Sequence, residues 1–313
     1  MNTPSTGMTE SSAQSQENTP AAPSSARALC WSIRREIWEN RTIYIGPLVA
    51  AALFLFGFAI NLLSVRRHIG ASPLGPAPLN TWHFKAHDLL ASRYELSAAL
   101  IMGTALIVGV FYSLDALYGE RRDRSILFWK SLPVSDLTTV LSKLTIPLLI
   151  LPLLSFAITL VTQFIMLVLS SVILLGSGVN IAALWTGVSF FRVSFVLLYH
   201  LLTVHGLYYA PIYGWLLMVS AWAPRAPFIW AFLPPFMICG VEKIAFNTSY
   251  LLALLEQRLT GPGNSMVDDH AKDFTGTLIP HHFFSAPGLW IGLAIAAIFL
   301  AVAVRLRRYR GPI

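Results

Sequence analysis

The chain contains a series of apolar segments that each reach the length of a membrane span. Runs that begin near residues 43, 97, 144, 192, 227 and 289 carry few charged side chains. An α-helix needs about 20 such residues to cross the hydrocarbon core of a bilayer. Of the 313 residues, 55% are hydrophobic and only 12% are charged, whereas a soluble domain is usually about one quarter charged. These features predict an all-α polytopic membrane protein.

We expect six transmembrane helices preceded by a polar tail. The tail, residues 1–25, is rich in Ser, Thr, Gln, Pro and Ala, and it should be disordered because it can bury too little apolar surface to offset the entropy of ordering. The membrane domain should occupy residues 26–313. The expected spans are 43–64, 97–117, 144–175, 192–222, 227–255 and 289–304, and residues 65–96 are expected to form a loop.

Prolines divide two of these spans. Pro147 and Pro152 should bend the third span, since proline removes a backbone donor and crowds the preceding turn. The fifth segment contains the pair Pro234–Pro235 and, further along, the charged pair Glu242–Lys243. We therefore expect the fifth segment to be broken into a span and a re-entrant or interfacial hairpin.

Two amphipathic segments accompany the spans. Residues 26–42 place Leu29, Ile33 and Ile37 four residues apart, which predicts a helix lying in the membrane interface, with Arg35 and Glu39 paired along it. Residues 118–143 form the most charged interior segment, between spans two and three. They should form a hairpin of two short helices joined at Pro133, the second of them capped by Ser135 and Asp136.

Basic residues are distributed unequally between the two sides that six spans would create. One side holds 14 of the 22 Lys and Arg residues, and by the positive-inside rule it should face the cytoplasm. Both termini and the hairpin lie on that side. The 14 are Arg27, Arg34, Arg35, Arg41, Arg121, Arg122, Arg124, Lys130, Lys143, Arg225, Arg305, Arg307, Arg308 and Arg310. The net charge of +7 is thus explained by membrane orientation, without a nucleic-acid partner.

A few polar side chains within or beside the spans are candidates for function. Tyr199, His200, His205 and Tyr209 on the fourth span could line a substrate path, or they could only form hydrogen bonds between helices. Asp115, near the end of span two, should reach the headgroups or pair with a neighbouring Arg.

Two histidines in the predicted loop are candidate metal ligands. His83 and His87 share a helical spacing and Asp88 adjoins them, but no further ligand is fixed by spacing. No metal site is therefore predicted.

The sequence lacks the motifs of an energy-converting enzyme. It has no Gly-x-x-x-x-Gly-Lys-Ser/Thr loop for nucleotide phosphates, no nucleophile elbow and no His-Glu-x-x-His motif. The spans also lack the paired carboxylates of an ion-driven carrier. We therefore predict that the chain is not an enzyme, holds no cofactor of its own, and receives energy for any transport from another chain.

The hairpin segment carries a recognisable order of residues. Glu120–Arg121, Ser125, Leu132-Pro133-Val134-Ser135 and Ser142-Lys143-Leu144 resemble the cytoplasmic signature of ABC-2 type permeases, the membrane subunits of a class of ATP-binding-cassette exporters. The segment departs from that pattern at Phe128-Trp129-Lys130, where many members carry aliphatic residues, and this leaves the subfamily and the substrate open.

The resemblance implies a function as the permease subunit of an exporter in the bacterial cytoplasmic (inner) membrane. Two copies, or one copy and a paralogue, would pair with two cytosolic ATPase subunits that bind ATP and Mg²⁺. In such permeases the N-terminal helix packs beside the loop that contacts the ATPase. The implied coupling residues are Glu120, Arg121, Arg122, Arg124, Phe128, Trp129, Pro133 and Ser135. The arginines could instead bind lipid phosphate. The alternatives are a stand-alone secondary transporter or channel, and a non-transporting polytopic membrane protein or enzyme.

Overall fold

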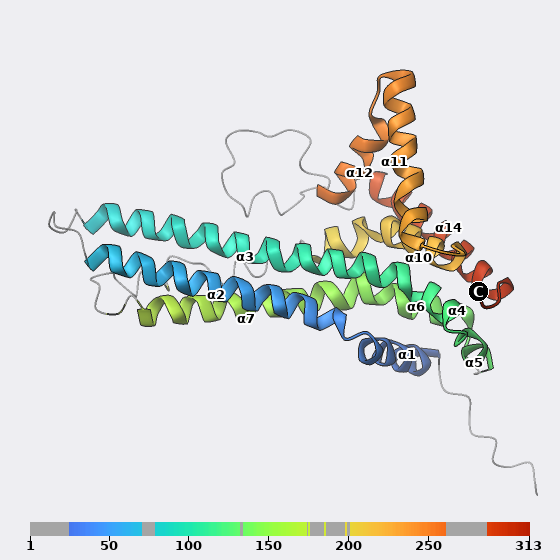
Figure 1. The fold of residues 1–313 in the computed structure, drawn as a ribbon, viewed down its shortest axis with the longest axis horizontal. Coiled ribbons are helices and arrows are strands. Elements are labelled where there is room, and N and C mark those ends of the chain that lie inside the picture. Colours follow the sequence, from blue (N-terminus) through green and yellow to red (C-terminus); the bar gives the residue numbers. More distant parts are fainter. Residues whose placement is uncertain are drawn as a thin grey trace, which may run out of the picture.

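The computed structural model describes residues 25–70, 79–131, 134–173, 201–260 and 287–313, together with the single residues 175, 185 and 198. Within these ranges every regular element is a helix (Figure 1). Five helical stretches are long and apolar enough to cross a membrane: Thr42–Ser64, Ser92–Arg122, Asp136–Ile173, Pro227–Phe246 and Pro287–Tyr309. The chain is therefore built as a multi-pass membrane protein.

A bundle of long helices forms the body of the molecule. Helix α2 (Thr42–Gly70), helix α3 (Leu79–Ala116) and the continuous stretch α6 (Asp136–Thr145), η1 (Ile146–Ile150) and α7 (Leu151–Ile173) run side by side (Figure 1). Close approach depends on small residues. A Cβ on Gly46 of α2 would lie 2.8 Å from the Val108 side chain of α3, so a larger residue there would push the two helices apart.

The prediction of a loop at residues 65–96 is wrong over most of that range. Helix α2 continues to Gly70 and helix α3 already begins at Leu79, so only residues 71–78 can separate them. The polar residues from Leu79 onward contain no Pro or Gly, so their polarity alone does not prevent a helix. His83, His87 and Asp88 fall within α3, but their side chains lie outside the described part of the chain.

The third predicted span contains the expected irregularity. Between α6 and α7 the helix widens into the π-helical turn η1, which includes Pro147 and is followed by Pro152. Proline cannot donate to the carbonyl four residues earlier and its ring crowds that carbonyl, so a wider turn relieves the clash without breaking the helix.

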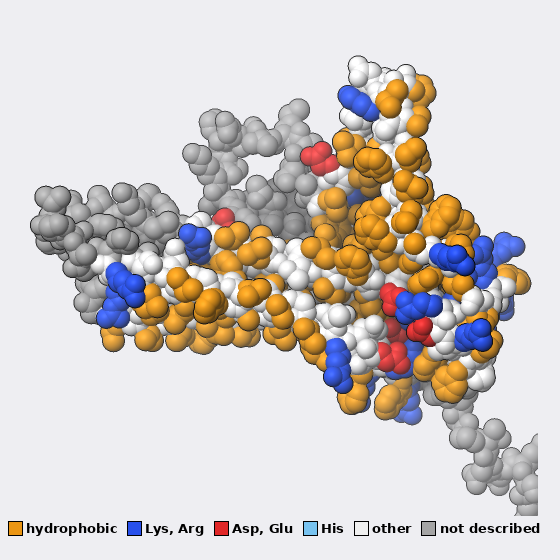
Figure 2. All heavy atoms as spheres, in the orientation of Figure 1, with side chains coloured by type: hydrophobic (Ala, Val, Ile, Leu, Met, Phe, Trp, Pro, Cys, Tyr) orange, Lys and Arg blue, Asp and Glu red, His pale blue; other side chains and the backbone are white. Residues whose placement is uncertain are grey.

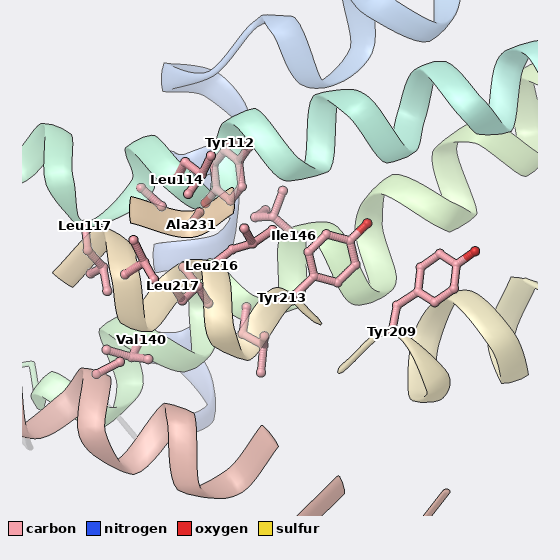
Figure 3. Packing of buried hydrophobic residues seen from close by; sticks show 14 of the residues in the cluster. Tyr112, Leu114, Leu117, Val140, Ile146, Tyr209, Tyr213, Leu216, Leu217 and Ala231 are labelled. Atoms are coloured by element: carbon pink, nitrogen blue, oxygen red, sulfur yellow. The ribbon is translucent and has the colours of Figure 1, made fainter. Parts of the chain in front are cut away.

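Helix α10 (Ala210–Trp222) follows the π-helical segment η2 (Leu201–Tyr208) and packs against α14 (Pro287–Tyr309). Gly214 allows this contact, because its Cβ position lies only 3.4 Å from the Ala296 carbonyl of α14. Apolar side chains from α3, α6, η1, α10 and α11 converge beside this helix pair to form the main core (Figure 3). The fourth predicted span, 192–222, is described mainly over its second half, so a sixth span remains a prediction.

Helices α11 (Pro227–Phe246) and α12 (Tyr250–Thr260) form a hairpin that projects away from the bundle (Figure 1). The predicted break at Pro234–Pro235 is wrong, because α11 is continuous through both prolines. Pro235 cannot donate to the Ala231 carbonyl, but the Trp215 indole N–H of α10 donates to that carbonyl at 3.1 Å. A neighbouring helix thus replaces the missing backbone bond.

The hairpin turns instead at Asn247, whose φ of 50° ends α11 in a left-handed conformation. Glu242 stabilises the turn, because its carboxylate accepts hydrogen bonds from the Thr248 hydroxyl at 3.1 Å and from the Leu251 N–H at 3.0 Å. A carboxylate at the start of a helix satisfies free backbone donors. The charged pair therefore shapes the turn rather than breaking the helix.

Candidate functional site: a buried ion cluster beneath helix α5

Charged side chains gather at one end of the molecule. Figure 2 shows Lys, Arg, Asp and Glu side chains together at the end where the C-terminus lies, while apolar side chains cover much of the bundle. The elements that meet there are α1 (Ser25–Glu39), α4 (Tyr118–Arg122), α5 (Ile126–Ser131), α6 and the end of α14. Several of these charges are not on the surface but inside the protein.

Glu36 of α1 is the most buried of these charges, with 1% of its surface exposed. It lies on the face of α1 that carries Ile33 and Ile37, which pack against the main core. Its carboxylate accepts a hydrogen bond from the Lys143 ammonium of α6 at 2.8 Å and one from the Tyr112 hydroxyl of α3 at 2.9 Å. These contacts fasten α1 to the bundle.

Glu120 of α4 joins this pair to the C-terminal helix. One of its oxygens lies 3.2 Å from the Lys143 ammonium, and the other lies 3.2 Å from the guanidinium of Arg307 on α14. Arg307 also lies 3.5 Å from the Asp136 carboxylate at the start of α6. We call Glu36, Glu120, Lys143 and Arg307 the ion cluster; all four are buried.

The ion cluster is electrically balanced, because it contains two carboxylates and two cations. Arg35 and Asp136, one of each sign, are partly exposed at its edge. Burial alone would raise the pKa of Glu36, but Lys143, Arg35 and the Tyr112 hydroxyl outweigh that effect and hold the pKa below its usual value. Glu36 is therefore ionised at neutral pH, and each charge of the ion cluster has an opposite charge within reach.

Backbone carbonyls of other helices also hold α4 and α5, which belong to the predicted hairpin of residues 118–143. The guanidinium of Arg121 on α4 donates to the carbonyl of Ala221 at 2.7 Å and to that of Ala223 at 3.2 Å. Lys130 of α5 donates to two carbonyls at the end of α14, each at 3.3 Å. Cations near the last carbonyls of a helix are favourable, because those carbonyls lack partners and carry the negative end of the helix dipole. Helices α4 and α5 are thus joined to α10 and α14.

Helix α5 exposes apolar side chains above this framework. Leu127 and Phe128 are 59% and 60% exposed. Trp129 is half-buried, its ring meets Phe128 edge to face, and the Arg35 guanidinium of α1 lies 3.6 Å from the ring centroid. A cation over an indole face is attracted to it. The exposed part of α5 therefore rests on α1 through Trp129.

The predicted coupling residues fall into two groups. Glu120 and Arg121 are buried, and their charged groups contact other parts of the chain. The exposed members are Arg122, Arg124, Phe128 and Ser135, and Trp129 is half-buried.

Three other contacts predicted from the sequence are present: the Ser135 cap, the ion pair of Asp115 and the Arg35–Glu39 pair. Ser135 caps α6, as expected, by accepting a hydrogen bond from the Thr138 N–H at 3.1 Å. Arg122 pairs with Asp115 at 3.8 Å, the expected partner of that carboxylate. Pro133 lies outside the described residues. The Arg35–Glu39 pair within α1 is also confirmed, at 3.4 Å.

The candidates for a substrate path are only partly described. Tyr199 and His200 lie outside the described residues, as does the side chain of His205. Tyr209 is buried, and its hydroxyl donates to the Leu259 carbonyl of α12 at 2.6 Å. Figure 3 shows Tyr209 at one edge of the main core, beyond Tyr213. Tyr209 therefore forms the interhelical hydrogen bond that was the alternative to a pathway role. Among the described side chains, no group of three His, Cys, Asp or Glu could hold a metal ion.

Sequence reasoning did not connect the members of the ion cluster. The sequence places Arg307 only among the basic residues expected on the cytoplasmic side, whereas the structure buries it. Glu36 gave a detectable signal, because it lies three residues after Ile33 and beside Ile37 on the apolar face of α1. A carboxylate on an apolar face predicts a buried partner. Lys143 gives the same signal between Val140 and Leu144 on α6.

Comparison of the chain with protein-family models, with curated proteins and with solved structures found no match.

Proposed function

We propose that this chain is the membrane-spanning permease subunit of an ABC exporter, in which α5 docks on a cytosolic ATPase subunit. The observation that carries this proposal is that α5 exposes apolar side chains while buried ion pairs and hydrogen bonds hold the elements beside it. Exposed Leu127 and Phe128 suit a binding surface. The ion cluster and the bonds of Arg121 and Lys130 would resist displacement of α5 when the partner pushes on it.

The proposed cycle uses ATP hydrolysed by the partner, which would also hold Mg²⁺. Two permease copies, identical or paralogous, would face two ATPases in a bacterial inner membrane, with both termini in the cytoplasm. Closure of the ATPase pair would move α5. Because Glu120 of α4 pairs with cations on α1, α6 and α14, these elements would move as one body and shift the dimer between two packings. The basic residues of this end suit anionic headgroups at the same membrane face.

The test is co-purification from the native host in mild detergent. We expect a cytosolic ATPase in stoichiometric amounts with the wild-type chain, and its loss with Phe128→Asp and with the pair Trp129→Ala and Arg122→Glu. Leu137→Asp is the matched control, because Leu137 is 54% exposed but lies on α6 rather than α5. All variants must insert and elute normally on size exclusion.

Two outcomes would refute the docking proposal. One is an ATPase that remains bound to both α5 variants. The other is wild-type protein that never carries an ATPase, even in several detergents; that result would favour a stand-alone carrier or a membrane enzyme.

A further inference from the structure

A groove lies between α2 and α3 on the half of the bundle away from the ion cluster. Its volume is about 570 Å³. The α2 side carries Ala50, Leu53, Phe54, Gly57 and Phe58, which follow the spacing of one helix face. A Cβ on Gly57 would meet nothing within 4 Å. The groove is therefore open along its apolar wall.

Two polar side chains lie at one end of this apolar groove. They are Asn61 of α2 and Arg93 of α3, and they are the only polar side chains of its lining within the described residues. Arg93 is half-buried, and no hydrogen bond or ion pair joins its guanidinium to another described side chain. A guanidinium in an apolar setting normally has an anionic partner. The groove thus offers a long apolar surface with one cation at its end.

The length of the groove matches one membrane leaflet. From Ala50 to Asn61 the helix advances eleven positions, which corresponds to about 16 Å at 1.5 Å per residue. One leaflet contributes about 15 Å of the hydrocarbon core. Arg93 lies near the start of the apolar part of α3, Ser92–Arg122, so its guanidinium stands at the depth of the headgroups.

We propose that this groove binds an anionic phospholipid, with an acyl chain along Leu53, Phe54 and Gly57 and the phosphate at Arg93. A helix from a second copy fits less well, because its apolar side chains would cover Arg93 and Asn61 without providing them with partners. The lipid supplies both an apolar chain and an anion from the bilayer itself. This site does not depend on the proposed partner ATPase.

Native mass spectrometry of the detergent-purified protein tests the proposal. The probes are palmitoyl-oleoyl phosphatidylglycerol and palmitoyl-oleoyl phosphatidylcholine, which share acyl chains and differ in net charge. We expect the first bound phosphatidylglycerol to have about tenfold higher affinity than the first bound phosphatidylcholine, as a charge-assisted contact provides. Arg93→Glu should remove this preference, and Arg93→Lys should keep part of it.

A pair of glycine variants tests whether the apolar part of the groove holds the acyl chain. Gly57→Phe should fill the groove and weaken phosphatidylglycerol binding. Gly103→Phe is the control, because Gly103 of α3 is also exposed with nothing within 4 Å of its Cβ position but does not line the groove. Equal binding of the two lipids by the wild-type protein would overturn the proposal. So would equal effects of the two glycine variants. If Arg93→Glu does not yield folded protein, the wild-type preference and the glycine pair decide.

Discussion

Removing Lys143 should be the most damaging single change within the ion cluster. Its ammonium lies 2.8 Å from one oxygen of Glu36 and 3.2 Å from one oxygen of Glu120. With an effective dielectric constant of about 20, the two attractions amount to about 6 and about 5 kcal/mol. The cost of removing the ions from water offsets most of this gain. The net effect therefore depends on whether any buried charge loses its partner.

Lys143→Met leaves two buried carboxylates without the cation that they share. We expect a loss of about 3–5 kcal/mol in the free energy of unfolding, the usual cost of an uncompensated buried charge. Glu36→Gln should cost less, about 1–3 kcal/mol, because Lys143 retains Glu120 and the Tyr112 hydroxyl can still donate to the amide oxygen. Adding Glu36→Gln to Lys143→Met should restore part of the lost stability, because the double variant again has equal numbers of buried charges.

Tryptophan fluorescence during heating of the purified protein in detergent provides the assay. Lys143→Met should lower the unfolding midpoint by at least about 6 °C, since each kcal/mol corresponds to about 2–4 °C in a chain of this size class. Arg41→Met is the control, because Arg41 is an exposed cation at the same end of the molecule. Additive losses in the double variant, or a Lys143→Met midpoint equal to that of Arg41→Met, would refute the reasoning.

Two further changes test other contacts. The pKa of Glu36 is held below its ordinary value of 4.5, so its contribution to stability is complete above about pH 4.5 and is lost as the pH falls through the lowered pKa. The difference in unfolding midpoint between wild type and Glu36→Gln should therefore shrink below pH 4.5; a constant difference down to pH 3 would contradict this. Trp215→Phe should cost about 1–3 kcal/mol by leaving the Ala231 carbonyl without a donor. In a Pro235→Ala background, where residue 235 regains its own N–H, the Trp215→Phe cost should vanish, and a persistent cost measured by the same melts would show that packing is responsible instead.

The apolar runs predicted the helices well because each helix must satisfy its own backbone in lipid. The expected first span, 43–64, and last span, 289–304, lie within α2 and α14. Helix ends were predicted less well, because polar residues beyond the membrane can continue a helix that the bilayer no longer requires. The start of α3 at Leu79 is the clearest case.

The errors at α11 and at the ion cluster share a physical cause. Pro235 is tolerated because an indole on another helix replaces its hydrogen bond, and Glu120 is buried because cations from α6 and α14 reach it. Both contacts join residues on different helices, so the pattern within one helix does not contain them. What the sequence does contain is one half of each contact, such as a carboxylate on the apolar face of α1.

A buried ion cluster is a poor source of stability, since apolar residues of similar volume often do as well. Its usefulness lies in defining one arrangement of α1, α4, α6 and α14, because any relative shift would leave a buried charge unpaired. On the proposed function, force applied to α5 therefore cannot be absorbed within this unit, and motion must arise at its borders. One border is η1, where the π-helical turn separates α6 from α7. The other is the α3–α4 break, where the Ser220 hydroxyl accepts from the N–H groups of Leu117 and Tyr118 at 3.0 and 2.9 Å. These two places connect the rigid end to the lipid-embedded helices, and a change in either would alter how movement of α5 reaches the membrane without weakening its contact with a partner.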